Sequence, residues 1–189
     1  MPADRCSHVL AFDDAPFTRG QRGRVLVVGT AWSGLRLEGV ISTHVRRDGA
    51  DATRAVAACL LASQFAAHTR LVMFQGIALA GFNVIDIHAL SRAVSAAVLV
   101  IARRPPSMDA IRAALLGRVR GGARKWKIIE EAGPMEPCGG VMVQRAGITG
   151  DEAAAVIARL SVHGNIPEPL RVAHLIAGGV TTGQSRGRA

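Results

Sequence analysis

His8-Val-Leu-Ala-Phe-Asp13-Asp14 is an apolar run that ends in two acids, and the architecture of the chain follows from it. Two further segments rich in β-prone residues come next, Arg24–Trp32 and Leu35–Val45, with a Ser-Gly turn between them. Such segments around a tight turn are typical of a β-hairpin. We therefore predict three strands in a meander, with two carboxylates at the end of the first strand.

Continuous apolar runs at Leu71–Gln75 and Ala97–Ala102 are typical of strands that are buried on both faces of a sheet. A helix is predicted before each, the first at Ala52–Ala67 with Asp51 as its N-cap, and helical crossovers join parallel strands. The first strand should then lie at the centre of a mixed sheet, beside the strand that ends at Gln75. The other expected elements are a helix after Gly81-Phe82-Asn83, a helix from Ser107 to Leu116, strands at Lys125–Ile129 and Gly140–Gln144, and helices at Gly150–Val162 and Pro169–Ala177.

The composition predicts one soluble globular domain, and the order of the predicted strands and helices makes it an α/β domain. A chain of 189 residues with 49% hydrophobic side chains can bury a core without disulfides or structural metal. We expect a single domain over residues 1–180, with helices flanking the mixed sheet, followed by a flexible polar tail over residues 181–189. Arginines interrupt the apolar runs before they reach the ~20 residues of a membrane span. No signal peptide is evident, so we expect a cytoplasmic protein.

The chain is strongly basic, with 23 Lys and Arg against 14 Asp and Glu and a formal net charge of +9. Only Lys125 and Lys127 are lysines, so arginine supplies nearly all of the positive charge. Arginine binds phosphate through two parallel hydrogen bonds and stacks on bases, which favours nucleic acid as a partner. A compositionally biased genome also produces an Arg-rich, Ala-rich chain, and net charge alone does not separate the two explanations.

Several acids stand at predicted strand ends and turns. Asp13 and Asp51 can converge on one edge of the sheet if the first and fourth strands are neighbours. Convergent carboxylates supply the oxygen ligands that Mg²⁺ prefers. Asp48 and Asp51, on either side of Gly49, equally suit an ordinary turn and a helix N-cap. From the pattern alone, a metal site and turn chemistry both remain open.

Basic residues also follow a predicted strand directly, at Arg103 and Arg104. Open α/β sheets bind ligands at this end of their strands, so a phosphate contact and a solvated loop are both consistent with the position. No Ser or Cys occupies a nucleophile elbow, and the glycines form neither a dinucleotide-binding pattern nor a P-loop. These absences argue against a serine hydrolase, a dehydrogenase and an NTPase.

Two prolines bracket Glu168 directly before the last predicted helix, which contains Arg171 and His174. The prolines fix how the chain enters this helix. The same arrangement would hold Glu168 or His174 at a site, so a structural and a functional interpretation both stand.

Five segments together resemble a mostly archaeal family that was long catalogued as a domain of unknown function and is sometimes labelled endonuclease dU. The resemblance covers nearly the whole chain, in order. The segments are Phe12–Asp14, Leu37–Val40, Arg47–Thr53, Gln75–Asp86 with its Gly-Phe-Asn-Val string, and Pro167–Ile176 with its Pro-Glu-Pro-Leu-Arg-Val-Ala-His string.

That family is similar to endonuclease V, which has a ribonuclease H-like fold and nicks nucleic acid near deaminated bases with Mg²⁺. The resemblance implies that Asp13 is the catalytic carboxylate of the first strand, with Asp14 beside it. It implies a second acid at Asp51, with Asp48 as the alternative. It also places Arg103 at the position of a basic residue that follows the fifth strand.

The chain departs from the endonuclease V pattern at two positions. Gln75 replaces an aspartate at the end of the fourth strand, and Ile148 stands where a histidine follows glycine. An amide oxygen can coordinate Mg²⁺ or Mn²⁺ but carries no charge, so we expect a weakened metal site. The chain also has no tyrosine, so a tyrosine wedge that separates strands beside a lesion is missing.

The leading hypothesis is a metal-dependent endonuclease that acts on deaminated, deoxyuridine-containing DNA. The alternatives are a catalytically degenerate nucleic-acid-binding protein of the same fold and an enzyme that acts on a small phosphorylated substrate. We expect DNA rather than RNA as the partner, and no membrane. The candidate residues are Asp13, Asp51 and Arg103 for catalysis, Asp13, Asp14, Asp51 and Gln75 for the metal, Arg46, Arg47, Asn83, Arg103 and Arg104 for nucleic acid, and Asp48, Asp86, Glu168 and His174 for support of the site.

Overall fold

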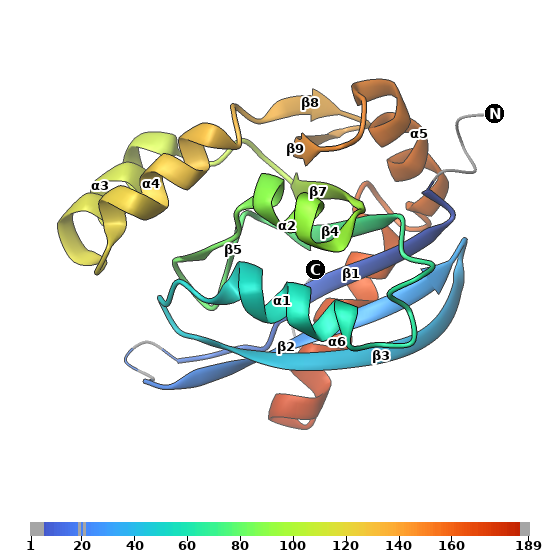
Figure 1. Cartoon of the computed structure of the whole chain (residues 1–189), viewed down its shortest axis with the longest axis horizontal. Coiled ribbons are helices and arrows are strands. Elements are labelled where there is room, and N and C mark those ends of the chain that lie inside the picture. The colour runs from blue at the N-terminus through green and yellow to red at the C-terminus, as the bar shows by residue number, and fades with distance from the viewer. Residues whose placement is uncertain (1–5, 19, 21, 186–189) are drawn as a thin grey trace.

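Figure 1 shows a computed structural model of the chain, which describes residues 6–18, 20 and 22–185. One seven-stranded mixed sheet has the order β3-β2-β1-β4-β7-β9-β8, and β5 and β6 form a separate small hairpin. In chain order the elements are β1 His8–Asp14, β2 Arg24–Ser33, β3 Arg36–Arg46, α1 Ala52–Leu61, β4 Leu71–Gln75, β5 Ala78–Leu79, β6 Asn83–Val84, α2 Ile87–Val94, β7 Ala97–Ala102, α3 Met108–Arg118, α4 Gly122–Glu131, β8 Glu136–Cys138, β9 Val141–Ala146, α5 Gly150–Leu160 and α6 Glu168–Thr182.

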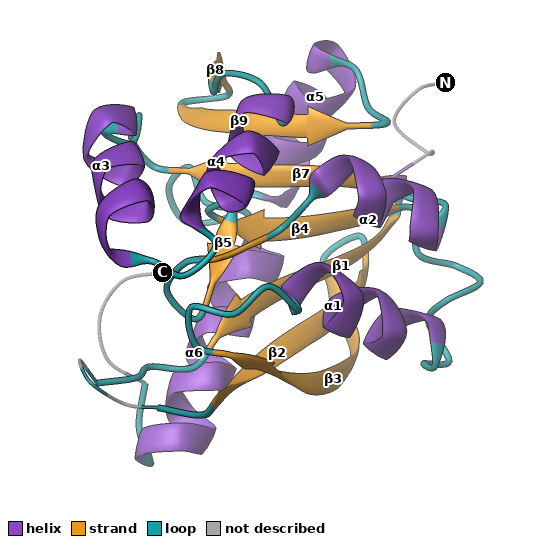
Figure 2. Ribbon diagram, turned by 60° about the vertical axis from the view of Figure 1, so that its left-hand side comes forward, coloured by secondary structure: helices purple, strands orange, loops and turns teal. Residues whose placement is uncertain are grey.

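The predicted mixed sheet is confirmed. β1 runs antiparallel to β2 and parallel to β4, and β4 runs parallel to β7. β1 therefore lies between β2 and β4, and β4 is the strand that ends at Gln75. Helices α1 and α2 cover one face of the sheet, and α5 and α6 cover the other (Figure 2).

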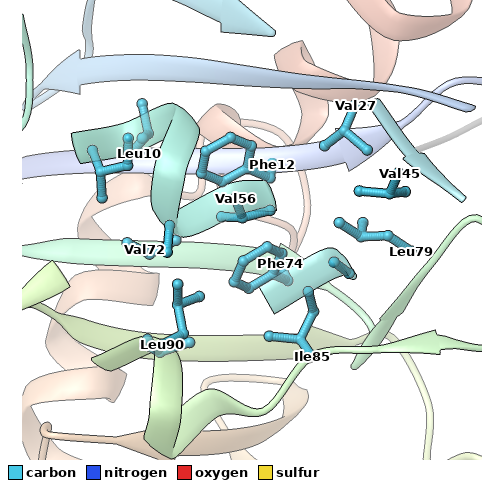
Figure 3. Close-up of a cluster of buried hydrophobic side chains, with 14 of the residues drawn as sticks. Leu10, Phe12, Val27, Val45, Val56, Val72, Phe74, Leu79, Ile85 and Leu90 are labelled. Atoms are coloured by element: carbon cyan, nitrogen blue, oxygen red, sulfur yellow. The ribbon is translucent and has the colours of Figure 1, made fainter. Parts of the chain in front are cut away.

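Alternation along the strands determines which side chains meet which helices. Phe12 and Phe74, which are paired in register, stack with 5.8 Å between ring centroids on the face covered by α1 and α2 (Figure 3). Ala11 and Met73 lie in the core cluster that includes residues of α5 and α6. By the same alternation, the next residues in the two strands, Asp13 and Gln75, lie on the α6 side of the sheet.

The strand predicted at Lys125–Ile129 is wrong, because these residues lie in the middle of α4. Lys125 and Ile129 are buried and Lys127 is exposed, which is the spacing of one helix face. The adjacent isoleucines 128 and 129 look like a short strand in sequence. With this helix, α3 and α4 form an antiparallel pair at one end of the sheet, which we call the helical arm (Figures 1 and 2).

Two helix boundaries also differ from the prediction. Helix α1 ends at Leu61, and Ser63 then donates a hydrogen bond to the carbonyl of Leu60, at 2.7 Å, in a turn. Helix α6 continues to Thr182, so the predicted flexible tail begins inside a helix. The last part of that predicted tail, residues 186–189, lies outside the described residues.

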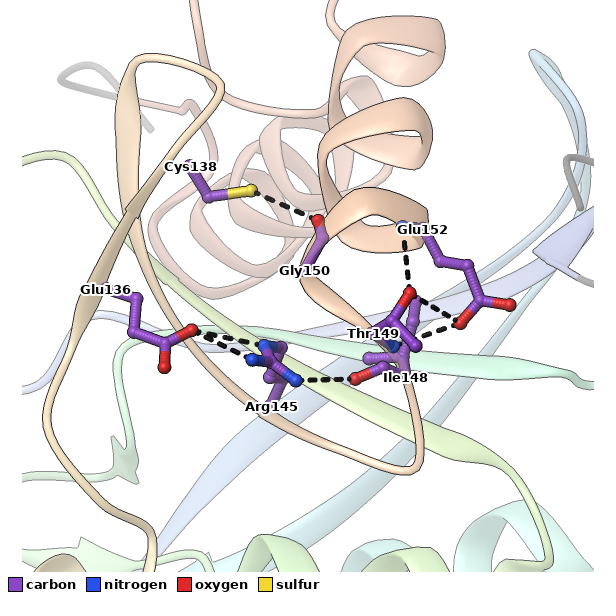
Figure 4. A network of polar contacts seen from close by, with 7 residues as sticks. All are labelled: Glu136, Cys138, Arg145, Ile148, Thr149, Gly150 and Glu152. Carbon is purple, nitrogen blue, oxygen red and sulfur yellow. Dashed lines mark hydrogen bonds and ion pairs between the residues drawn. The ribbon is translucent and has the colours of Figure 1, made fainter.

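A polar network joins the β8–β9 hairpin to α5 (Figure 4). Arg145 pairs with Glu136 at 3.1 Å and donates to the carbonyl of Ile148 at 3.0 Å. Thr149 and Glu152 form a capping box at the start of α5. The segment around Ile148 is therefore held by structural contacts.

Among the described residues, no helix has both the length and the apolar character needed to cross a membrane.

Candidate active-site edge

The carboxyl ends of β1 and β4 place Asp13 against the last helix. Asp13 is 7% exposed, and its Oδ2 lies 2.8 Å from Nδ1 of His174 in α6. The start of α6 is fixed to the sheet because Thr30 of β2 donates a hydrogen bond to the carbonyl of Pro169 at 2.9 Å. Glu168 pairs with Arg171 within α6 at 2.7 Å, so Glu168 supports the helix start.

Burial dominates the electrostatics of the two consecutive acids. It raises the pKa of Asp13, while the hydrogen bond and the charge of His174 oppose the shift. The pKa of Asp14 is raised to about 6, first by burial and then by repulsion from Asp13. A cation near either carboxylate would favour its ionised form.

Gln75 ends β4 one residue beyond the register pair Phe12–Phe74. Its Oε1 is buried and, among the described residues, has no hydrogen-bond partner. A buried oxygen without a donor normally costs about 1–3 kcal/mol. Since this oxygen lies on the same side of the sheet as Asp13, a hard cation held by both residues would satisfy it, and the residues present fit such an ion.

Few acidic side chains at this edge of the sheet are available to bind a metal. Within the described residues, no group of three or more His, Cys, Asp or Glu side chains could hold a metal ion. The amide oxygen of Gln75 is a further potential ligand that does not belong to these four residue types. Any metal held here would therefore have few charged ligands.

Asp14 lies on the other side of the sheet, where the β5–β6 hairpin holds it. Its Oδ2 accepts a hydrogen bond from the Ala80 amide at 3.1 Å, and the Ala80 carbonyl accepts one from the Asp48 amide at 2.9 Å. Oδ1 of Asp48 accepts from the Phe82 amide at 2.8 Å. The hairpin thus links Asp14 to the loop before α1.

Asp51 is part of a structural pair with Asn83. Its Oδ1 accepts hydrogen bonds from Nδ2 of Asn83 at 2.7 Å and from the Arg46 amide at 3.1 Å. Asp51 is the N-cap residue of α1, as predicted, but its side chain makes no capping hydrogen bond because its carboxylate is directed to these donors. Oδ1 of Asn83 accepts from the Ala52 amide at 3.0 Å instead. Asn83 is fully buried, and both ends of its amide are engaged within the protein.

The remaining candidates are placed as follows. Asp86 caps α2 by accepting a hydrogen bond from the Ala89 amide at 2.8 Å. Arg103 and Arg104 are exposed at the end of β7 and line a pocket of about 370 Å³. The guanidinium of Arg47 lies 5.3 Å from the ring centroid of Phe17. The structure thus brings Asp13, Gln75 and His174 to one side of the sheet edge, and it holds Asp14, Asp48 and Asp51 on the hairpin.

Sequence reasoning missed several basic residues of the helical arm, Arg120 and Arg124 among them. They escaped notice because part of α4 was predicted as a strand. A helical interpretation of Gly122–Glu131 would have placed them at the turn between α3 and α4.

The endonuclease dU family profile matches residues 5–181 of the chain. A UPF0215 protein of Deinococcus radiodurans is 54% identical over 184 residues, with 97% of this chain and 94% of that protein covered. A crystal structure of a protein of unknown function from Archaeoglobus fulgidus superposes with a TM-score of 0.86 at 31% identity, covering 93% of this chain and 98% of that one.

The fold is also that of endonuclease V. The Ciona intestinalis endonuclease V, solved with a DNA that contains an inosine, superposes with a TM-score of 0.56 at 12% identity, covering 88% of this chain and 82% of that one. At that identity the likeness concerns the fold alone. The profile match and the close relatives together show that this chain belongs to the endonuclease dU family.

Proposed function

We propose that the chain is a metal-dependent endonuclease that acts on deaminated DNA at deoxyuridine. One observation carries the proposal: buried Asp13, paired with His174, and the unsatisfied oxygen of Gln75 end two adjacent parallel strands. Membership of the endonuclease dU family and the endonuclease V fold support it.

Asp13 and Gln75 would hold the ion, with the charge of neighbouring Asp14 contributing to the field. A bound Mg²⁺ or Mn²⁺ would lower the pKa of a coordinated water and neutralise charge on the phosphodiester. Asp51 would contribute only if its carboxylate left Asn83, since both are joined by a hydrogen bond of 2.7 Å.

His174 is placed to move a proton. Its Nδ1 faces Asp13, which orients the ring, and among the described residues Nε2 has no hydrogen-bond partner. Nε2 would take a proton from the attacking water or give one to the leaving oxygen. Arg103 and Arg104 would bind the phosphate from the end of β7.

A deaminated base must leave the stack to be recognised. A largely apolar cavity of about 220 Å³ lies beyond the ends of β4 and β7, and its lining includes Gly76, Phe82 and Gln144. It would receive such a base, with Phe82 and the neighbouring apolar side chains against the ring. The Gln144 side chain donates to the carbonyl of Gly133 at 2.6 Å, which fixes its orientation in the cavity wall.

The substrate is tested with labelled duplexes that carry one deoxyuridine, one deoxyinosine or no lesion. We expect Mg²⁺-dependent nicking that is fastest at deoxyuridine and is lost on chelation. Equal cleavage of the undamaged duplex would contradict the lesion specificity, and cleavage that survives chelation would contradict the metal dependence.

The neutral Gln75 favours a second candidate, a nucleic-acid-binding protein of the same fold that has lost its metal. It predicts salt-dependent binding to all of these duplexes and no cleavage with either Mg²⁺ or Mn²⁺. The same duplex panel therefore separates the two functions.

A further inference from the structure

A second feature lies outside the edge formed by Asp13, Gln75 and His174. A groove of about 850 Å³ runs between helices α1 and α2 on one side and the helical arm on the other. Within the part of the chain that the structure describes, four arginines from three segments line it. They are Arg46 at the end of β3, Arg54 in α1, and Arg120 and Arg124 at the turn and start of α4.

The positive charge of this groove is available to a ligand. The side chains of these four arginines are exposed and make no hydrogen bond or ion pair with any of the described residues. Two described acids of the lining are already engaged: Asp48 accepts from the Phe82 amide, and Asp86 accepts from the Ala89 amide. Lys125 is buried and donates to the carbonyl of Asp48 at 2.6 Å, so it holds the arm to the loop.

The groove suits phosphates rather than bases. Its lining includes small and aliphatic residues such as Ala57, Val84 and Ile128, and no aromatic side chain among the described residues lines it. Stacking platforms for bases are therefore missing, while guanidinium groups stand on both walls. Such a lining binds a backbone without reading its sequence.

One loop links the lining of the groove to Asp14 by hydrogen bonds. Asp48 lines the groove, and its amide donates to the Ala80 carbonyl, whose own amide donates to Asp14.

We propose that this groove binds the phosphate backbone of a nucleic-acid strand, with the helical arm as its second wall. The proposal rests on the proposed function only for the class of partner, and it assigns binding roles to Arg54, Arg120 and Arg124. It does not require the protein to cleave the strand.

The test compares two triple variants of the full chain. R54A/R120A/R124A removes three groove arginines. The matched control R22A/R92A/R118A removes three exposed arginines that are unpaired among the described residues and do not line the groove. Equal far-ultraviolet spectra and melting temperatures establish that both variants fold.

Binding of a labelled oligonucleotide is then measured by fluorescence anisotropy over a range of salt concentrations. Each lost phosphate contact lowers the log–log salt slope by about 0.7 for a single strand, so the groove variant should lose about 2 in slope. The control variant should keep the slope of the unmodified protein. Equal slopes for the two variants would overturn the proposal, and so would equal competition by a mononucleotide and an oligonucleotide.

The outcome is independent of cleavage. If the protein nicks a deoxyuridine duplex but the groove variant binds like the control, the groove proposal is refuted and the proposed endonuclease function is supported. If the protein cleaves none of the duplexes, and the salt slope of the groove variant falls as predicted, the proposed endonuclease function is refuted and the groove proposal is supported.

Discussion

Replacing Asp14 by Asn should stabilise the protein at neutral pH. The pKa of Asp14 is raised from an ordinary 3.8 to about 6 by burial and by Asp13. Ionisation of Asp14 is therefore less favourable in the folded state than in the unfolded chain, which lowers the free energy of unfolding. A difference of about 2 pKa units corresponds to about 3 kcal/mol at pH 7. Asn keeps an acceptor for the Ala80 amide and removes the charge.

The sign of the pH dependence follows from the raised pKa. Below about pH 4, Asp14 is protonated in both states, so the cost is absent. Between pH 4 and 6 it is protonated mainly in the folded state, and above about pH 6 the full cost is present. The stability difference between Asp14→Asn and the unmodified protein should therefore grow from near zero at pH 4 to about 3 kcal/mol at pH 7.

Urea unfolding of both proteins at several pH values measures this difference. The contributions of the other titrating groups to the pH dependence of stability are nearly the same in both proteins and cancel in the comparison. Asp14→Ala is the matched comparison: it also removes the charge but leaves the Ala80 amide without its acceptor, at a cost of about 1–3 kcal/mol. A gain for Asn that is the same at pH 4 and pH 7, or a loss at pH 7, would refute the electrostatic account of this edge.

Three further perturbations test the site. Gln75→Asp restores a charged ligand and should lower the Mg²⁺ concentration for half-maximal nicking by about 10-fold, or about 1.4 kcal/mol, whereas an unchanged metal dependence would exclude Gln75 as a ligand. His174→Ala should slow nicking at saturating Mg²⁺ by about 100-fold or more, with a flattened pH–rate profile, and an unaltered profile would remove His174 from proton transfer. Gly81→Ala would strain a backbone at φ +86° and press against Oδ1 of Asp48; calorimetry should show destabilisation of about 1–3 kcal/mol, and an unchanged melting temperature would contradict the tight packing of this loop.

Much of the fold could be predicted because local pattern and topology agree. The apolar runs that became β1, β4 and β7 indicate strands, and the crossovers between them fix their order. The strand predicted at Lys125–Ile129 failed because two adjacent isoleucines suit a strand as well as a helix. The buried Lys125, whose ammonium reaches the Asp48 carbonyl, is a tertiary contact that no local pattern reveals.

From the sequence, only those features of the candidate site that depend on backbone position could be predicted. Asp13 and Gln75 end adjacent strands, and strand order alone places them side by side. The direction of the Asp51 carboxylate depends on Asn83, which lies 32 residues away in sequence. The pairing of His174 with Asp13 spans 161 residues, and the Pro-Glu-Pro string was its only local signal. Side-chain partners of this kind require the packed structure.

The most direct test of the active-site edge is nicking of a deoxyuridine duplex by Asp13→Asn, with Mg²⁺ present and the fold verified by its melting temperature. Asn keeps the shape of the side chain and an oxygen near His174 but removes the charge that would hold the metal. The account predicts that the unmodified protein nicks the duplex at the lesion and that the variant does not. Nicking by Asp13→Asn at the rate of the unmodified protein would contradict it.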